Sequence, residues 1–147
     1  MDTIMATVEY VGDLRTKGVH LKSGNTYTTD APTDNQGKGE AFSPTDLVSA
    51  ALSSCMMTIM GQVANREGVN MNGLKTEIVK IMASNPRKIA EIKVTFSHPN
   101  FQATEVQKQK LMNDQIEKMY REKLQQLKLQ QEEYLKKLQE YRRQQPV

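Results

Sequence analysis

A single cysteine, Cys55, is the side chain of this sequence best suited to covalent chemistry. A thiolate can take up oxygen from a peroxide, whereas a free cysteine inside an apolar segment is usually an inert part of a core. Activation needs a nearby cation, because Cys55 is expected about three turns into a helix and the helix dipole acts mainly in the first turn. Arg15 and Arg87 are the candidate cations, since Arg66 lies roughly 16 Å farther along the same helix.

The other nucleophilic and metal-binding residue types form no recognisable constellation. His20 and His98 could in principle act as a base for Cys55, but both lie in or beside strand patterns, where surface roles are more common. The acidic loop 30–42 lacks the Asp/Asn spacing and the late Glu of a calcium loop. One cysteine also excludes an intrachain disulfide and a cysteine-rich metal site. We therefore expect neither a metal nor a cofactor.

The charge distribution argues against a nucleic-acid partner. The formal net charge is +3: residues 1–100 carry 10 basic and 10 acidic side chains, and residues 101–147 carry 10 and 7. This excess is interleaved with acids, whereas a nucleic-acid surface needs clustered basic charge. The N-terminus lacks the regions of a signal peptide, and the longest uncharged apolar stretch, Leu47 to Met60, is too short to span a bilayer. With a lone thiol, these features predict a cytoplasmic protein that binds neither nucleic acid nor a membrane.

A long helix should position Cys55. Ser43 can cap it, Pro44 suits its first position, and Asp46 stands where a capping box wants an acid. The helix should run to about Arg66 and end at Gly68. Its middle, LVSAALSSCMMTIM, is apolar or small on every face, which predicts burial on all sides. Methionines in and near it would fill the core or line an apolar pocket: Met56, Met57, Met60, Met71 and Met82.

Alternating polar and apolar residues predict antiparallel strands around that helix. Thr3 to Tyr10 reads as a half-buried strand, and Ser23-Gly24-Asn25 joins two further strands, residues 14–22 and 26–29. After the helix, residues 74–84 and 88–97 form a second hairpin whose inward side chains include Ile92, Val94 and Phe96. The fold class is therefore α+β, with antiparallel strands around a long buried central helix.

The composition changes near residue 100, which divides the chain into a domain at 1–103 and an extension at 104–147. All eight glycines lie at or before Gly73, and 11 of the 13 glutamines lie at or after Gln102. A continuous helix capped by Thr104 would be roughly 60 Å long, against a radius of gyration of about 13 Å for a 100-residue domain. Such a helix must protrude, bend back or pack on another chain.

The extension carries a coiled-coil rhythm that predicts a helix–helix partner. Alternating spacings of four and three relate Tyr120, Leu124, Leu127, Gln131, Tyr134, Leu138 and Tyr141. The alternative is a single solvated helix held by ion pairs four residues apart, such as Glu117 with Arg121.

The segment GEAFSPTDLVSAALSSCMMTIM, residues 39–60, resembles the central helix of the OsmC/Ohr family of thiol-dependent peroxidases. The shared features are the Ser/Asn-Pro start, the small residues before the thiol, and the apolar continuation. The flanking strands follow the family order, and the resemblance covers residues 1 to about 110. It implies an intertwined homodimer that reduces organic hydroperoxides, with Cys55 as the thiol that attacks the peroxide. Arg15 resembles the family arginine that stabilises the thiolate.

The sequence departs from this family at two places. Ohr-type members have a Glu after the Pro that pairs with the arginine; this chain has Thr45, so Asp46 or Glu40 would have to replace that Glu. The second, resolving cysteine should fall near residues 118–119, and neither it nor the closing strand is present. A natural fusion, a frame change or an engineered chimera would give this pattern.

Two functional hypotheses follow. The first is an OsmC-like redox protein that reacts with organic hydroperoxides through one cysteine, with turnover limited by the missing second thiol. The second is a non-catalytic homo-oligomeric assembly module whose C-terminal helix is the working part and whose Cys55 is inert.

Overall fold

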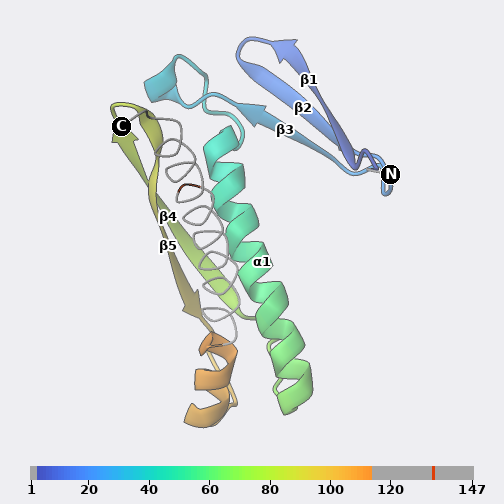
Figure 1. The fold of residues 1–147 in the computed structure, drawn as a ribbon, viewed down its shortest axis with the longest axis vertical. Coiled ribbons are helices and arrows are strands. Elements are labelled where there is room, and N and C mark those ends of the chain that lie inside the picture. The colour runs from blue at the N-terminus through green and yellow to red at the C-terminus, as the bar shows by residue number, and fades with distance from the viewer. Residues whose placement is uncertain (1–2, 114–133, 135–147) are drawn as a thin grey trace, which may run out of the picture. The chain divides into compact units, whose positions relative to one another are not determined.

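The computed structural model describes residues 3–113 and Tyr134. The chain divides into two compact units: unit 1 comprises Met1–Cys55 and Leu74–His98, and unit 2 comprises Met56–Gly73 and Pro99–Val147. One long helix, α1 (Pro44–Glu67), contributes its first half to unit 1 and its second half to unit 2 (Figure 1). The domain boundary at 103/104 stays a prediction, because most of the extension lies outside the described residues.

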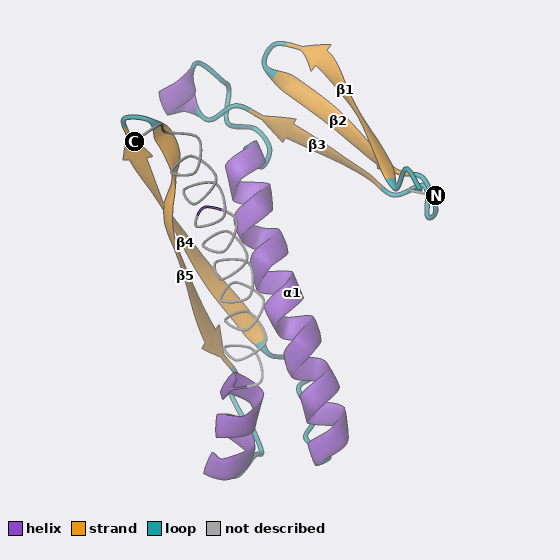
Figure 2. Cartoon of the chain, viewed as in Figure 1, coloured by secondary structure: helices purple, strands orange, loops and turns teal. Residues whose placement is uncertain are grey.

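Unit 1 begins with an antiparallel sheet of β1 (Ala6–Gly12), β2 (Arg15–His20) and β3 (Thr26–Asp30), in the order β1-β2-β3 (Figure 2). The predicted strands and their hairpin are confirmed. The half-buried state predicted for the first strand is wrong for the single chain, because Val8 and Tyr10 are 60% and 64% exposed. Alternation reports which side chains share a face of a strand, and only the tertiary structure decides whether another element covers that face.

The start and end of α1 follow the local sequence. The N–H of Asp46 donates to Ser43 Oγ at 3.1 Å, and the N–H of Ser43 donates back to Asp46 Oδ2 at 3.0 Å, which is the predicted capping box. Pro44 occupies the first helical position. At the other end, Gly68 adopts a φ of +67°, a conformation that glycine reaches without a steric penalty.

The prediction that this helix is buried on all sides is wrong for the single chain. Ser49, Ser53, Met60, Val63 and Ala64 are buried, whereas Val48 is 56% exposed and Cys55 is exposed. The buried positions lie along one face of the helix, because the described part of one chain supplies cover along one face only. An apolar sequence on every face shows that a helix can be buried on every face. Whether it is buried depends on which other segments or chains pack against it.

The length and composition of α1 also meet the criteria for a membrane-spanning helix, which the core helix of a soluble protein can meet as well. This feature alone does not indicate a membrane protein. The expectation that the protein binds no membrane stays a prediction.

A second hairpin follows α1 in unit 1. β4 (Lys75–Ser84) and β5 (Arg87–Ser97) pair in antiparallel register through a tight turn at Asn85-Pro86, as predicted. The predicted inward residues Ile92, Val94 and Phe96 are half-buried, whereas their neighbours Lys93 and Thr95 are exposed. This confirms the facing of β5.

Unit 2 contains the apolar core of the described residues, made of Met60, Val63, Ala64, Val69 and Leu111. A helical stretch over residues 105–113 begins with the expected cap: Gln107 N–H donates to Thr104 Oγ1, and Thr104 N–H donates to Gln107 Oε1. Gln107 Nε2 also donates to the carbonyl of Glu67, the last residue of α1, at 3.1 Å. The start of the C-terminal helix is thus confirmed. Apart from Tyr134, the predicted coiled-coil positions lie outside the described residues.

Candidate functional site

Cys55 lies in the middle of α1, on the exposed side of the helix. Ser53, two residues earlier, is only 2% exposed. Two residues correspond to about 200° around a helix, so an inward Ser53 turns Cys55 outward. The sequence predicts a thiol inside a core, whereas Cys55 is open to solvent in the single chain. The interpretation of Cys55 as an inert, buried cysteine therefore loses its main support.

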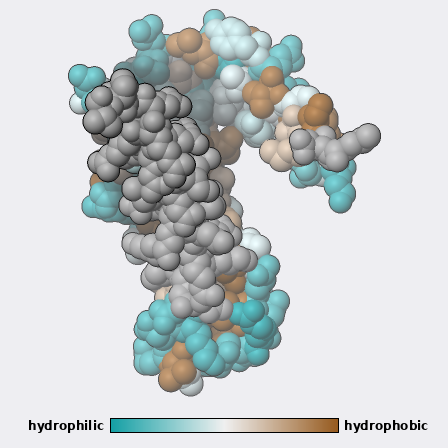
Figure 3. Space-filling model, viewed as in Figure 1, coloured by the Kyte–Doolittle hydropathy of each residue, from teal (hydrophilic) through white to brown (hydrophobic). Residues whose placement is uncertain are grey.

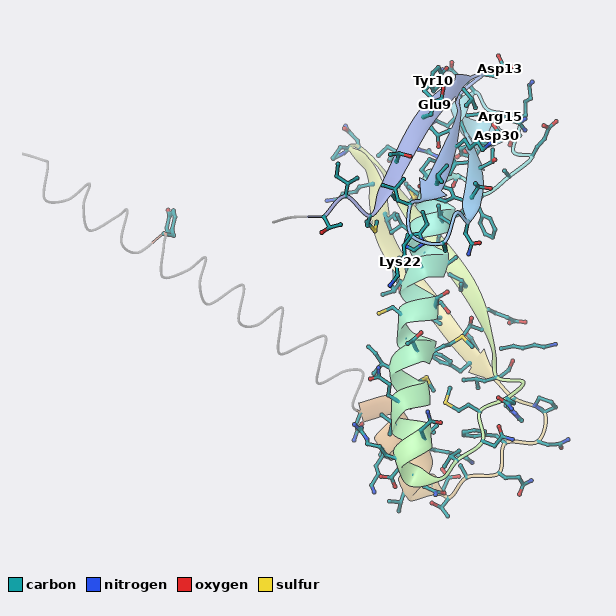
Figure 4. The ribbon with its side chains drawn as sticks, turned by 90° about the vertical axis from the view of Figure 1, so that its right-hand side faces the viewer. Glu9, Tyr10, Asp13, Arg15, Lys22 and Asp30 are labelled. Carbon is teal, nitrogen blue, oxygen red and sulfur yellow. The ribbon has the colours of Figure 1, made fainter. Side chains whose placement is uncertain are left out.

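Arg15 stands at the centre of an ion-pair cluster formed by two strands and a loop. It opens β2 and pairs in register with Asp30, the last residue of β3. Its Nη2 donates to Asp30 Oδ2 at 3.3 Å and to Glu40 Oε2 at 2.5 Å. Asp30 Oδ2 also accepts the N–H of Glu40 at 2.9 Å. Figure 4 shows Arg15 and Asp30 side by side at this end of the sheet.

The cluster has unusual electrostatics because the Asp30 side chain is completely buried. The Glu40 N–H holds the pKa of Asp30 below its usual range, and Arg15 acts in the same direction, against the opposing effect of burial. Asp30 in turn raises the pKa of Arg15. One donor of the guanidinium, Nε, is buried and has no hydrogen-bond partner among the described residues. Arg15 therefore keeps a permanent positive charge and an unused N–H.

A second cluster of polar contacts, centred on Lys80, links α1 to β4. Lys80 Nζ lies 2.7 Å from Asp46 Oδ1 and donates to Thr45 Oγ1 at 2.7 Å and to Ser43 Oγ at 3.3 Å. Burial alone would raise the pKa of Asp46, but hydrogen bonds from Lys80 and Ser43 outweigh it and leave this pKa below its usual range. The Lys80 side chain is only 16% exposed. This cluster secures the first turn of the helix that carries Cys55.

These contacts distinguish the carboxylates that the sequence offered as partners for Arg15. Glu40 binds Arg15, whereas Asp46 binds Lys80 and Ser43. Thr45, at the position where Ohr-type members carry Glu, also binds Lys80. Among the described residues the partners of Arg15 are carboxylates, and none of its contacts is to Cys55.

Sequence reasoning missed Asp30 and Lys80, although both left a signal. Asp30 was assigned to the loop after the strand, yet the hairpin that pairs Val19 with Thr26 also places Arg15 opposite Asp30. Lys80 is the charged residue in the alternating series Thr76, Ile78, Lys80 and Met82, whose members are all half-buried. A charge at an inward position requires a partner.

The remaining candidates lie elsewhere. Arg87 binds Asp34 at 3.2 Å, on the short helix η1 (Thr33–Asn35). His20 is exposed and shares a hydrogen bond with Ser23. Within residues 3–113 and 134, no group of His, Cys, Asp and Glu could hold a metal ion. Of the five methionines proposed as core filler, Met60 is buried and the other four are half-buried.

A cavity of about 560 Å³ lies in unit 1 between the start of α1 and β4. It is lined by Ala41, Phe42, Asp46, Ser49, Ala50, Ile78, Val79 and Lys80. Its wall is mostly apolar, with the Lys80–Asp46 pair at one side. A second cavity, of about 480 Å³, lies in unit 2 at the end of α1 and includes Met71 in its wall.

Comparison with known proteins places this arrangement in a family. Residues 37–119 match the family model described as OsmC-like protein. A crystal structure from Psychrobacter arcticus, of a protein assigned to osmotic stress induction and detoxification response, is 40% identical with a TM-score of 0.75; the match covers 79% of this chain and 84% of that one.

A second solved structure shares the fold at much lower identity. It is an OsmC-like protein of unknown function from Vibrio cholerae, 17% identical with a TM-score of 0.64, and the match covers 80% of this chain and 90% of that one. A search of curated proteins gives no match. The family match over more than half of the chain and the 40% identity together show that this chain belongs to the OsmC-like family.

Proposed function

We propose that this protein reacts with organic hydroperoxides through Cys55. The thiolate attacks the outer oxygen of the O–O bond, the S–O bond forms as the O–O bond breaks, and the leaving alkoxide takes a proton and departs as an alcohol. Cys55 is oxidised to a sulfenic acid, and the peroxide is reduced by two electrons. The observation that carries the proposal is the exposed thiol at the middle of an apolar helix in an OsmC-like chain.

Arg15 is the cation that we assign to thiolate stabilisation. It is permanently charged, its guanidinium is oriented by Asp30 and Glu40, and its Nε is a buried donor with no partner in the described part of the chain. Glu40 then takes the place of the family Glu in orienting the guanidinium. Asp46 belongs instead to the support of the helix start.

The missing second thiol limits the reaction. A dithiol site captures its sulfenic acid as a disulfide, which protects the sulfur and passes the electrons on. This chain contains one cysteine, so the sulfenic acid waits for an external thiol or meets further peroxide and becomes a sulfinic acid. Because Cys55 is exposed in the single chain, external thiols can reach it.

The exposed apolar side chains of unit 1 support a homodimer. Val8, Tyr10, Phe42 and Val79 are each more than half exposed, and hydrophobic side chains appear on the surface of the described residues in Figure 3. Val8 and Tyr10 share one face of β1, and adjacent exposed apolar side chains are typical of an interaction site. We propose that a second copy of the chain covers it.

Intact-mass measurements test the reaction. Without added thiol, cumene hydroperoxide should be consumed to about one or two equivalents per chain, and Cys55 should gain one and then two oxygens. Cys55→Ser should consume none, and oxidised methionines are separated by peptide mapping. An unmodified Cys55 under conditions that oxidise exposed methionine would refute the proposal.

The role of Arg15 is tested by its variant and a matched control. Arg15→Ala should slow the oxidation of Cys55 about tenfold or more, because a desolvated guanidinium donor is lost. Arg87→Ala removes an arginine that binds Asp34 at an exposed site and should leave the rate unchanged. Equal rates for wild type and Arg15→Ala, with both chains folded, would exclude Arg15 from the site.

A further inference from the structure

The inner face of β4 has a composition that packing alone does not explain. Thr76, Ile78, Lys80 and Met82 are half-buried, and their neighbours Lys75, Glu77 and Val79 are exposed. Two of the four inner positions are therefore polar. A strand face that packs on a helix normally presents apolar side chains, because a buried polar group needs a hydrogen-bond partner.

Both polar residues of this face bind α1. Thr76 Oγ1 accepts a hydrogen bond from Ser53 Oγ at 2.8 Å. Lys80 Nζ contacts Thr45 and Asp46 in the first turn of the helix, each at 2.7 Å. Ser53 is 2% exposed, so its bond to Thr76 lies in a desolvated setting where hydrogen bonds are strong.

The spacing of the two contacts on the strand matches their spacing on the helix. Thr76 and Lys80 are four residues apart, which is about 13 Å along a strand. Ser53 lies seven and eight residues after Asp46 and Thr45, which is about 11–12 Å along a helix. The residue numbers rise along the helix as they fall along the strand, so this part of α1 runs antiparallel to β4.

These contacts supply what apolar packing lacks here. Hydrophobic burial is non-directional, and the helix presents small side chains such as Ser49 and Ala50 to this region, which offer few ridges to resist sliding or rotation. A hydrogen bond weakens steeply when its geometry changes. Two such contacts at matched spacing therefore define both the axial position and the rotation of the helix.

We infer that Thr76 is a positioning residue for Cys55, acting through Ser53, with Lys80 setting the axial position of the same helix. Ser53 held inward by Thr76 turns Cys55, about 200° farther around the helix, to the open side. Without the Thr76 hydroxyl, the helix gains rotational freedom and the thiol samples other surroundings. The relevance to peroxide reduction rests on the proposed function, whereas the orientation of the thiol does not.

The experiment measures the alkylation rate of Cys55 by iodoacetamide as a function of pH, together with its oxidation by cumene hydroperoxide. Thr76→Val keeps the shape of the side chain and removes the hydroxyl. We expect it to change the alkylation rate about fivefold to tenfold and to shift its pH profile, with the oxidation rate lowered by a similar factor. Thr76→Ser restores the hydroxyl and should return both rates to within about twofold of wild type.

Two further variants keep the test decisive. Thr95→Val makes the same chemical change at an exposed position of β5 and should leave the pH profile unchanged. If Thr76→Val fails to fold, Ser53→Ala removes the other half of the bond while favouring the helix, and the same shift is expected. Profiles of Thr76→Val or Ser53→Ala that overlay wild type would overturn the inference. Alkylation without any peroxide oxidation would instead refute the proposed function and leave this inference to be decided by the alkylation data.

Discussion

The two units of this chain stabilise their folds by different means. Among the described residues of unit 2 the buried side chains are apolar, and Met60, Val63 and Leu111 are each at most 4% exposed. In unit 1 the buried side chains are polar, among them Asp30 and Ser53, while Val8 and Tyr10 are exposed. The described part of unit 2 thus has an apolar core, whereas unit 1 is held by directed polar contacts and leaves large apolar side chains exposed.

The difference shows where the candidate chemistry resides. Arg15, Glu40 and Cys55 all belong to unit 1, where a directed ion pair links Arg15 to Glu40. Apolar packing as in unit 2 stabilises strongly but specifies orientation weakly. Unit 1 therefore supplies directed contacts among the candidate residues, and its exposed apolar residues are consistent with a proposed second copy completing its core.

The largest effect is expected in the core of unit 2. Leu111→Ala removes a side chain that is 1% exposed and should lower the free energy of unfolding by about 2–5 kcal/mol, because a cavity remains. Its neighbour Met112 is 40% exposed, so Met112→Ala should change stability by less than about 1 kcal/mol. Urea denaturation measures the free energy of unfolding of both variants. Equal decreases for Leu111→Ala and Met112→Ala would show that Leu111 does not belong to a packed core.

The next effect concerns the proposed cover of unit 1. Val8 and Tyr10 share one face of β1, so replacing both by Lys should weaken dimer formation by about 100-fold or more, because two charges would be buried in an apolar contact. Val106 in unit 2 is 67% exposed, and Val106→Lys is the control that should leave the assembly intact. Sedimentation equilibrium measures both, and a monomeric wild type would contradict the dimer.

The buried carboxylate of unit 1 should make stability depend on acid. The pKa of Asp30 is lower in the folded chain than its unfolded value of about 3.9. The contribution of Asp30 to the free energy of unfolding is therefore fully present above about pH 5. It begins to fall near the unfolded pKa and is lost as pH drops through the lower folded pKa. Asp30→Asn should be less stable at neutral pH and lose less on acidification.

The control for this acid effect is Asp13→Asn, at an exposed carboxylate that binds Lys38. Because solvent screens an exposed pair, its thermal midpoint should follow that of wild type at each pH. If Asp30→Asn shows the same acid loss as wild type, the buried ion pair is not what makes unit 1 sensitive to acid.

The smallest effect is expected where unit 1 holds the helix start. Lys80→Met keeps most of the side-chain volume and removes the contacts to Thr45 and Asp46, which should cost about 1–2 kcal/mol because solvent partly compensates a half-exposed Asp46. Lys93→Met, at an exposed position of β5, should change stability by less than about 0.5 kcal/mol. Thermal unfolding of the two variants should therefore separate them clearly.

Much of the local structure could be predicted from the sequence, because its causes are local. The Ser43–Asp46 capping box, the φ of Gly68 and the alternation of Ile92, Val94 and Phe96 each depend on residues a few positions apart. The start of the helix at Thr104 has the same origin. The resemblance of residues 39–60 to the OsmC family is likewise a local pattern, and the family match bears it out.

Burial and pairing depended on the tertiary structure, because they require segments far apart in the chain to meet. The apolar sequence around Cys55 predicts that α1 can be covered on every side, yet within the described residues the face of Ser53 is buried and Cys55 is exposed. The sequence alone left both Glu40 and Asp46 as candidate partners of Arg15. The register of β2 and β3 places Asp30 opposite Arg15. The packing of β4 on α1 pairs Asp46 with Lys80 instead.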